Sequence, residues 1–472
     1  MRKWHFVLPG SLVLVFSLLS TTMLIAQEPS WWGGAGGLAE YGSDFFGPSG
    51  PYRPTVLEVV EVAAAFIWQS PDLAERDGWQ VTPLFVEDRG HAVGLVFEVP
   101  SSCCSAYVVA TGDKRLPPVI AYSPVSAFPW ERSHANALAD MVEYDIQERL
   151  RALEDGTAPA EDVRKNLLHW ERLRMLATMP PLRTLALGAP FGTILATNVS
   201  TQGGFSLRIG LQGTCALSAS APQGPWMTFD TWNQVGIYDD LCPRDTAETG
   251  EPRSRAGCVA TAMAQIIYHW QYPASVFFPS TTYTWGLRVD GKLRHGTVHK
   301  STASMTAIPY ASLAECRKRL SFAAGVSVEM KYSYPLSVAS LLDAAEALRV
   351  TWGYSSAEYS DNADGMLTVR IYESIARTSL SLGVVTIGSH PRPAIMGVPR
   401  KRIDTDTWID DPHDELHAVV VDGFKAGPAG EDQVLYWINC GWGGTSDSYY
   451  SLPCGYPQNH NVVKAAVLKV HP

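Results

Sequence analysis

The chain has 472 residues, of which 46% are hydrophobic and 18% charged, and its formal net charge is −10. This length exceeds one ordinary domain and predicts two large units, each with its own core. The composition is that of a globular protein and excludes an intrinsically disordered one. The acidic balance, with no basic run longer than Arg400 to Arg402, excludes a nucleic-acid-binding surface.

The first 26 residues have the pattern of a secretory signal peptide. Arg2 and Lys3 precede a mostly apolar run from Phe6 to Ala26, whose last residue is small enough for cleavage. An uncleaved membrane anchor is the alternative, because the run is almost long enough to span a bilayer. The strongest apolar stretch, Leu12 to Leu19, has signal-peptide length, and no later run approaches spanning length. We therefore expect export and no stable membrane anchor.

Residues 27–181 begin with an extended leader over 28–50 that is rich in Gly, Pro, Ser and Trp. A helix is predicted over Val56 to Gln69, followed within residues 90–124 by the β-type runs HAVGLVFEV, SAYVVAT and PPVIAYS. Two further helices are predicted around 138–153 and 163–176, and Pro180 and Pro181 end the second. Residues 182–223 are poor in charge and rich in small residues, as is typical of a linker that proteases cut.

Eight cysteines are too few for a disulfide scaffold in a chain of this length. No pair of CxxC motifs occurs, which argues against structural zinc. The adjacent Cys103 and Cys104 cannot both point into one core from a strand, because successive side chains alternate between faces. Outside the cell some of the cysteines can be bridged, and the sequence does not specify the pairs.

Cys258 follows a glycine at the start of an amphipathic helix, in the segment GCVATAMAQIIYHW over residues 257–270. Apolar residues recur there at helical spacing and predict one face packed into a core. They are Val259, Met263, Ile266, Ile267 and Trp270. A helix N-terminus stabilises a thiolate and can lower a cysteine pKa to roughly 3.5–7.5, which suits a nucleophile. A small buried hydrophobe is the alternative, since free cysteine is among the most buried residue types.

A histidine and an asparagine far downstream complete the pattern of a cysteine peptidase. His417 opens the β-like run HAVVVDGF, and VLYWI over residues 434–438 predicts the partner strand of a hairpin, ending at Asn439. At the same end of two neighbouring strands, the two side chains can lie side by side. This suits an imidazole that pairs with a thiolate and protonates the leaving amine, together with a group that orients the ring. The order Cys, His, Asn is also that of papain-like enzymes.

The segment HDELH over residues 413–417 offers a different chemistry, because two histidines four apart resemble the zinc-protease motif HExxH. Its glutamate stands at the third position instead of the second. Pro412 before the segment and the β-branched residues after it also disfavour a continuous helix. We therefore expect neither a metal nor another cofactor.

Taken together, these segments resemble the streptopain family, secreted bacterial cysteine peptidases of the papain superfamily. The resemblance rests on the GCVATAMAQI helix, the HAVVVDG strand, the NxGWGG turn at Asn439 to Gly444 and the upstream TWNQ. Residues 56–176 also resemble the family's propeptide. The implied fold is α+β: a papain-like catalytic domain, with a helical part carrying the cysteine and an antiparallel sheet carrying His and Asn, preceded by an α+β propeptide domain.

Carried over by position, the resemblance implies Cys258 as nucleophile and His417 as general base and acid. Asn439 would orient the imidazole, and Trp442 would shield that contact from water. Gln234 would supply an oxyanion-hole amide beside the Cys258 backbone N–H, a contribution of about 3 kcal/mol in analogous sites. The alternatives are that Gln234 caps a turn and that Trp442 is an ordinary core residue.

Three positions depart from the family pattern. Cys440 replaces the tryptophan that usually follows the asparagine, and Leu416 replaces the glycine that usually precedes the histidine. The segment YSYPLSVAS over 332–340 stands where the family has a Gly- and Ser-rich cleft segment. Leu416 and Val338 are therefore predicted to contact substrate and to narrow specificity. A disulfide between Cys440 and Cys454 is a further hypothesis.

The sequence thus predicts a bacterial cysteine endopeptidase that is secreted, periplasmic or at the cell surface and is made as a zymogen. The predicted parts are a signal peptide (1–26), a propeptide-like inhibitory domain (27–181), a linker (182–223) and a catalytic domain (224–472). Its predicted partners are protein or peptide substrates and its own propeptide. A catalytically silent binding or inhibitor protein of the same fold is the alternative, although such a descendant need not keep Cys, His, Asn and Gln together.

Overall fold

The computed structural model describes most of the chain beyond residue 43. The described residues are 44–74, 76, 79–85, 90–99, 105–130, 137–178, 217, 219, 222, 224–225, 227, 231–376, 378–381, 384–387, 392–402, 405, 407–414 and 416–472. The predicted signal peptide, most of the predicted leader and of the predicted linker, and Cys103, Cys104 and Cys215 lie outside them. Within the described part, no helix combines the length and apolar character needed to cross a bilayer.

The N-terminal half, residues 44–178, contains the elements predicted for it and one additional strand. They are α2 (Val56–Gln69), β1 (Gln80–Leu84), β2 (Gly94–Val99), β3 (Ala106–Thr111), β4 (Val119–Ser123), α3 (Ala137–Glu154) and α4 (Ala160–Thr178). Helix α2 begins with a capping box, in which the Thr55 hydroxyl accepts from the Glu58 N–H and the Glu58 carboxylate accepts from the Thr55 N–H. Strand β1 was not predicted from the sequence.

The C-terminal half, residues 231–472, holds the predicted cysteine helix and the predicted hairpin. Its helical elements are η2 (Gly236–Tyr238), α6 (Cys258–Trp270), η3 (Lys300–Ala303), α7 (Leu313–Ser327), α8 (Leu341–Val350), α9 (Leu367–Ala376) and η4 (Gln458–His460). Its strands are β5 (Thr282–Val289), β6 (Lys292–His299), β7 (Ser356–Asp361), β8 (Thr378–Ser381), β9 (Val384–Ile387), β10 (Ala394–Val398), β11 (Arg400–Lys401), β12 (Trp408–Ile409), β13 (His417–Gly427), β14 (Gly430–Asn439), β15 (Ser448–Tyr450) and β16 (Ala465–His471).

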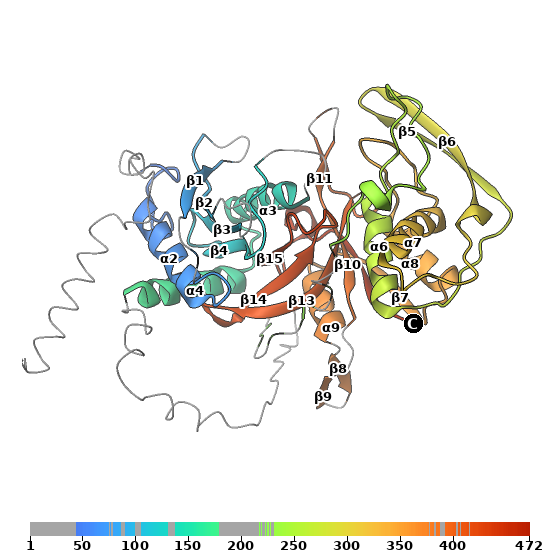
Figure 1. Cartoon of the computed structure of the whole chain (residues 1–472). Coiled ribbons are helices and arrows are strands. Elements are labelled where there is room, and N and C mark those ends of the chain that lie inside the picture. Colours follow the sequence, from blue (N-terminus) through green and yellow to red (C-terminus); the bar gives the residue numbers. More distant parts are fainter. Residues whose placement is uncertain are drawn as a thin grey trace, which may run out of the picture.

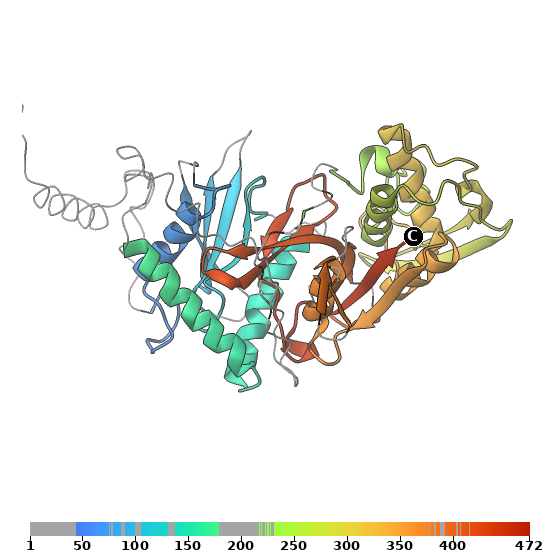
Figure 2. The ribbon, with the colours of Figure 1, turned by 90° about the horizontal axis from the view of Figure 1, so that it is seen from below.

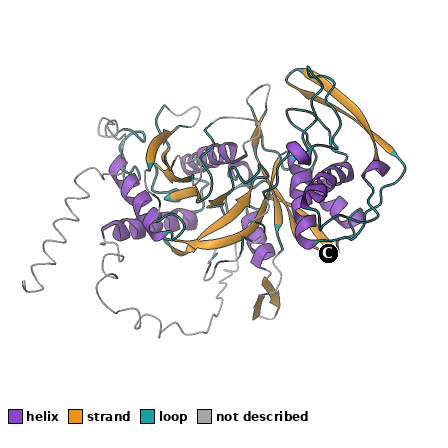
Figure 3. Cartoon of the chain, in the orientation of Figure 1, coloured by secondary structure: helices purple, strands orange, loops and turns teal. Residues whose placement is uncertain are grey.

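One antiparallel sheet runs through both halves of the molecule. Its strands follow the order β1-β2-β3-β4-β15-β14-β13-β10-β16-β7. The junction is the pairing of β4 with β15, where Tyr122 stands opposite Tyr449 and Ala121 opposite Tyr450. Figures 1 and 3 show this sheet crossing the centre of the molecule, with α6, α7 and α8 gathered at one end and α2 and α4 at the other.

Three hydrophobic cores cover the two faces of this sheet. The alternation of side chains along β13 sends Ala418 and Val420 into the core around α6, α7 and α8, and Val419 and Val421 into a second core on the opposite face. The second core also holds residues of α3, β3 and β4, and the third joins α2 and α4 to β14 and β15. The side-by-side placement of α2 and α4 is visible in Figures 1 and 2.

The expectation that each half buries a core of its own is only partly right: the core around α6, α7 and α8 contains no described residue of the N-terminal half, whereas the two halves share the other two cores. Trp437 and Tyr449 of the C-terminal half pack in one core with Val108 and Tyr122 of the N-terminal half. Apolar patterning reveals which side chains are buried but not which part of the chain covers them. The two halves bury much of their apolar surface against each other.

Buried and half-buried polar contacts also join the two halves. The Asp432 carboxylate lies 2.6 Å from an Arg172 nitrogen and 3.3 Å from His169 Nε2, and these partners hold the pKa of Asp432 well below its usual range. Lys425 Nζ lies 3.0 Å from the Asp72 carboxylate. The Ser123 hydroxyl donates to the Asp447 carbonyl at 2.7 Å. The N-terminal half is thus held by specific polar contacts as well as by apolar packing.

The cysteine arrangement differs from the one hypothesised. Cys454 is disulfide-bonded, whereas Cys440 is a buried free thiol whose Sγ lies 3.4 Å from the Ser446 carbonyl. A Cys440–Cys454 disulfide is therefore excluded. Cys242, Cys258 and Cys316 are likewise buried free thiols.

Candidate active site

The glycine before the nucleophile allows Cys258 to stand at the first turn of α6. Gly257 has φ of 91°, a conformation that side chains rarely adopt, and a Cβ there would lie 2.8 Å from the Met330 methyl carbon. The sequence predicted that one face of this helix packs into a core. Instead all residues from Cys258 to Ile267 are buried, because α7 and α8 as well as β13 pack around the helix.

The β13–β14 hairpin brings His417 to the cysteine. The Cys258 Sγ lies 3.9 Å from the carbonyl oxygen of Leu416, the residue before His417. Asn439, at the end of β14, stands opposite Val420, so it lies at the same end of the hairpin as His417. The structure therefore brings together three of the predicted site residues, from segments far apart in the chain.

Gln234 approaches the same site through the segment that precedes the helix. The Ala256 N–H donates to the Gln234 carbonyl at 3.0 Å, which fixes the TWNQ segment two residues from Cys258. The Gln234 side-chain nitrogen is buried and makes no hydrogen bond within the described part of the chain. A buried amide without a partner is costly, and such a group is suited to bind a ligand oxygen.

The GWGG turn packs on this segment and on the start of α6. Gly441, Gly443 and Gly444 have φ of 70°, 67° and 83°. A Cβ on Gly441 would lie 3.1 Å from the Thr261 methyl group, and one on Gly443 would lie 3.1 Å from the Asn233 amide nitrogen. The Gly443 N–H donates to the Trp232 carbonyl at 2.6 Å. The glycines thus permit both the backbone conformation and the close approach.

The hydrogen bonds of an active triad are not formed in this structure. The Asn439 side-chain oxygen accepts from the Gly441 N–H at 3.0 Å. Among the described residues, none hydrogen-bonds to the buried His417 Nε2. The structure therefore places the elements that carry Cys258, His417 and Asn439 side by side, without the hydrogen bonds that would join a thiolate, an imidazolium and its orienting amide.

Burial also favours the uncharged forms of Cys258 and His417. It raises the pKa of the Cys258 thiol, against the influence of the Ala418 backbone and of the Arg400 charge. It lowers the pKa of His417 to about 4, and the Arg400 charge adds to this lowering. At neutral pH the site therefore contains a thiol and a neutral imidazole.

Arg400 is a part of the site that the sequence analysis missed. In the sequence it stands out only as part of a short basic run. In the structure Arg400 is buried on β11, and its positive charge acts to lower the pKa of Cys258. No local pattern signals this, because β11 has two residues and lies far from Cys258 in the chain.

The remaining predicted residues occupy defined but different environments. Leu416 and Val338 are both buried, at 4% and 3% exposure, and Val338 exchanges backbone hydrogen bonds with Lys331. Trp442 is half-buried and packs against the core that α3 and β13 share. The roles of Leu416 and Val338 toward substrate and of Trp442 as a shield stay predictions.

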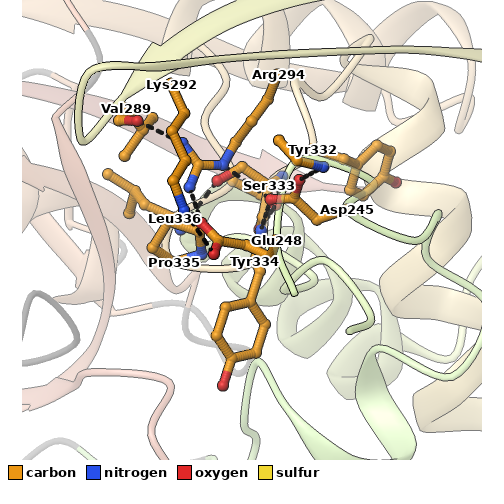
Figure 4. A network of polar contacts seen from close by, with 12 residues as sticks. Asp245, Glu248, Val289, Lys292, Arg294, Tyr332, Ser333, Tyr334, Pro335 and Leu336 are labelled. Atoms are coloured by element: carbon orange, nitrogen blue, oxygen red, sulfur yellow. Dashed lines mark hydrogen bonds and ion pairs between the residues drawn. The ribbon is translucent and has the colours of Figure 1, made fainter. Parts of the chain in front are cut away.

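A buried ion-pair network orders residues 332–340, called here the cleft loop (Figure 4). Arg294 Nε lies 2.8 Å from the Asp245 carboxylate, and Arg294 also pairs with Glu248. The same Asp245 carboxylate accepts from the Tyr334 N–H at 2.8 Å. The β5–β6 hairpin that carries Arg294 thereby fixes the conformation of the cleft loop.

A cavity of about 650 Å³ lies beside the GWGG turn, between the two halves of the chain. Ser126 and Phe128 line it from the N-terminal half, and Thr231, Gly443 and Asp447 line it from the C-terminal half. Cys258 and His417 do not line it. The cavity therefore lies between the N-terminal half and the turn and does not reach Cys258.

The site and the fold together define a papain-like cysteine peptidase. A cysteine stands at the start of a buried helix, a histidine lies on the adjoining antiparallel sheet, and the architecture is α+β. The match to a family model specifies this class further. Residues 232–450 match the model of the Peptidase C10 family. The matched part of the chain contains all the predicted site residues, and the predicted resemblance to the streptopain family is confirmed.

A solved structure shares the fold of most of this chain. A fragment of Prevotella intermedia prointerpain A with a cysteine-to-alanine substitution is 18% identical, covers 84% of this chain and 99% of its own, and superposes with a TM-score of 0.51. The active wild-type interpain A cysteine protease of Prevotella intermedia is 24% identical over 53% of this chain and 96% of its own, with a TM-score of 0.37. No curated protein sequence matches the chain.

Proposed function

We propose that the chain is a secreted bacterial cysteine endopeptidase made as a zymogen. In this mechanism the Cys258 thiolate attacks the scissile carbonyl, and the His417 imidazolium protonates the leaving amine. Water then hydrolyses the acyl-enzyme with His417 as general base. The Gln234 amide and the Cys258 N–H stabilise the oxyanion, and Asn439 orients the imidazole.

The observation that carries this proposal is the position of Cys258 at the N-terminus of α6, with its Sγ 3.9 Å from the residue preceding His417. A helix N-terminus favours a thiolate, and a neighbouring imidazole can accept the proton. The unpartnered buried amide of Gln234 supports an oxyanion-binding role. A protein retained only for binding has no need of this combination.

The proposed zymogen form rests on the state of the site in the uncut chain. Cys258 and His417 are 5% and 2% exposed and both uncharged at neutral pH, so the chemistry is suppressed. The N-terminal half shares two cores with the catalytic half and is the proposed intramolecular inhibitor. Cleavage within residues 182–223 is the proposed first step of activation.

Labelling with an epoxide inhibitor directed at papain-like sites tests the proposal. We expect the matured protein to be modified on Cys258 and on no other cysteine, as located by peptide mapping. The mass of the labelled chain gives the cleavage position, and N-terminal sequencing of the exported protein tests removal of residues 1–26. A protein that hydrolyses casein without reacting at Cys258 would overturn the assignment of the nucleophile.

Replacing the proposed oxyanion donor tests the mechanism. Gln234→Ala is expected to lower kcat by about 10²–10³, with little change in KM, because the donor acts mainly in the transition state. Steady-state kinetics on a fluorogenic peptide measures both constants. An unchanged kcat in a variant with the native thermal midpoint would contradict the role of Gln234.

The pH dependence of thiol alkylation tests the suppressed state. In freshly prepared uncut chain, the raised pKa of Cys258 keeps the thiol protonated at neutral pH. The pKa of His417, lowered to about 4, leaves almost no imidazolium at pH 6–7 to stabilise a thiolate. Iodoacetamide labelling of Cys258 should therefore be slow at pH 6–7 and accelerate only at alkaline pH. The matured form, with its site uncovered, should react rapidly at pH 6–7. Equal rates for the two forms would show that the site is not suppressed.

A further inference from the structure

Arg255 is held in a fixed position beside the nucleophile. It lies three residues before Cys258, and the next residue, Ala256, donates its N–H to Gln234. The Arg255 N–H donates to the Ser333 carbonyl at 3.1 Å, and the Ser337 hydroxyl donates to the Arg255 carbonyl at 2.7 Å. Its backbone is therefore clamped between the TWNQ segment and the cleft loop.

The side chain of Arg255 connects the two sides of the candidate site. Its guanidinium carbon lies 5.3 Å from the centre of the Trp442 ring and 5.9 Å from that of the Tyr334 ring. Its Nε donates to the Pro335 carbonyl at 3.1 Å. Trp442 belongs to the turn that follows Asn439, whereas Tyr334 and Pro335 belong to the cleft loop. The guanidinium thus lies where a substrate passing between these segments would meet it.

The charge of Arg255 is not matched by a carboxylate. Among the described residues it forms no salt bridge, and the Nε–H is the one donor of its five that has a partner. Partial burial lowers its pKa, although the charge of Asp239 opposes this. The buried Arg294 nearby is paired with Asp245 and Glu248. Arg255 is therefore a half-buried cation whose terminal nitrogens are available to an incoming anion.

We propose that Arg255 binds a substrate carboxylate next to the scissile bond and makes the enzyme prefer an acidic side chain there. The inference rests on the proposed peptidase function and adds a substrate class to it. A guanidinium already stacked on two aromatic rings is pre-organised, and its two terminal nitrogens match a carboxylate in bidentate geometry. Neither Leu416 nor Val338 can supply this preference, because both side chains are apolar and buried.

Peptide pairs that differ only by Glu or Gln at one position test this specificity. The peptides are amidated at the C-terminus, and each of the two residues flanking the scissile bond is varied in turn. With the native enzyme, kcat/KM for the Glu peptide should exceed that for its Gln partner by roughly tenfold at one position, as expected for a charge-assisted pair. In Arg255→Leu the ratio should fall to about one, and Arg255→Glu should favour a Lys peptide at that position.

Arg253→Leu is the matched control, since Arg253 lies two residues earlier, is exposed and donates to the Cys242 carbonyl. It should keep the native Glu/Gln ratio of kcat/KM.

Peptides with a free C-terminal carboxylate are tested separately. A preference confined to these peptides would identify the chain end as the anion and overturn the side-chain proposal. Hydrolysis with a Glu/Gln ratio near one, or a ratio that Arg255→Leu does not change, would overturn the role of Arg255 while leaving the peptidase function intact. Loss of hydrolysis of every peptide by the native matured protein would instead contradict the proposed function, and binding of the same peptide pairs to Cys258→Ala would still test the selectivity.

Discussion

The Cys258→Ala chain should have no detectable peptidase activity and should remain a single uncut polypeptide. Removing a nucleophile eliminates covalent catalysis, which in comparable triads lowers kcat by about 10⁶. Casein hydrolysis measures the activity, and gel electrophoresis over time follows self-cleavage. Added native enzyme should still cut the variant in the linker, because the substrate segment is unchanged.

Cys316→Ala provides the matched control for this variant. Cys316 is also a buried free thiol, but it lies on α7 within the helical core. This substitution should preserve both hydrolysis and self-cleavage. Persistent activity in Cys258→Ala would show that another group is the nucleophile. An inert native protein that never cleaves itself would favour the alternative of a silent binding protein.

Arg149→Ala should lower the free energy of unfolding by about 3–5 kcal/mol, because it leaves a buried carboxylate without its partner. Arg149 is 1% exposed and contacts both oxygens of Asp145 at 2.9 Å. It also donates to the Ser451 carbonyl at 2.6 Å, and the Tyr450 hydroxyl donates to Asp145 at 3.0 Å. The pair therefore ties α3 of the N-terminal half to the end of β15.

Urea unfolding in the Cys258→Ala background, which prevents self-digestion, measures this loss. Arg151→Ala is the matched control, since Arg151 pairs with Glu148 on the same helix but its side chain is 42% exposed. A pair this exposed contributes no more than about 1 kcal/mol. Replacing Arg149 by Met and Asp145 by Leu together should recover much of the lost stability. Equal losses for Arg149→Ala and Arg151→Ala would show that burial of the pair does not matter.

The sequence predicted the elements whose signals are local. The helix over Val56–Gln69 has a capping box at its start, and α6 has a glycine that alone tolerates the required conformation. The β-like runs HAVVVDGF and VLYWI likewise predicted the β13–β14 hairpin. Strand β1 was missed because Pro83 weakens its pattern, and a proline is tolerated there because β1 is the outermost strand of the sheet.

The candidate site was predicted in part. The motif residues Cys258 and His417 could be found because each sits at the start of a recognisable element, and the structure brings those elements together. Arg400 and Arg255 could not be found in this way. Arg400 matters because it lies near Cys258, which is distant in the chain, and Arg255 matters because no described carboxylate pairs with it. The uncharged state of the site was also unforeseen. The protonation state depends on burial, and the local sequence does not determine how many other groups cover a side chain.

The pairing of β4 with β15 has a consequence for activation. Strand β15 has three residues, and in the uncut chain both of its sides are hydrogen-bonded. Cutting the linker breaks the polypeptide but none of these bonds, so departure of the N-terminal half is a separate event with its own barrier. If the N-terminal half departs after cleavage, β15 becomes an edge strand with no partner on one side, and Tyr449 on β15 and Trp437 on β14 lose part of their cover. The catalytic half would then present a template for strand addition, either to the released half or to a second copy of itself.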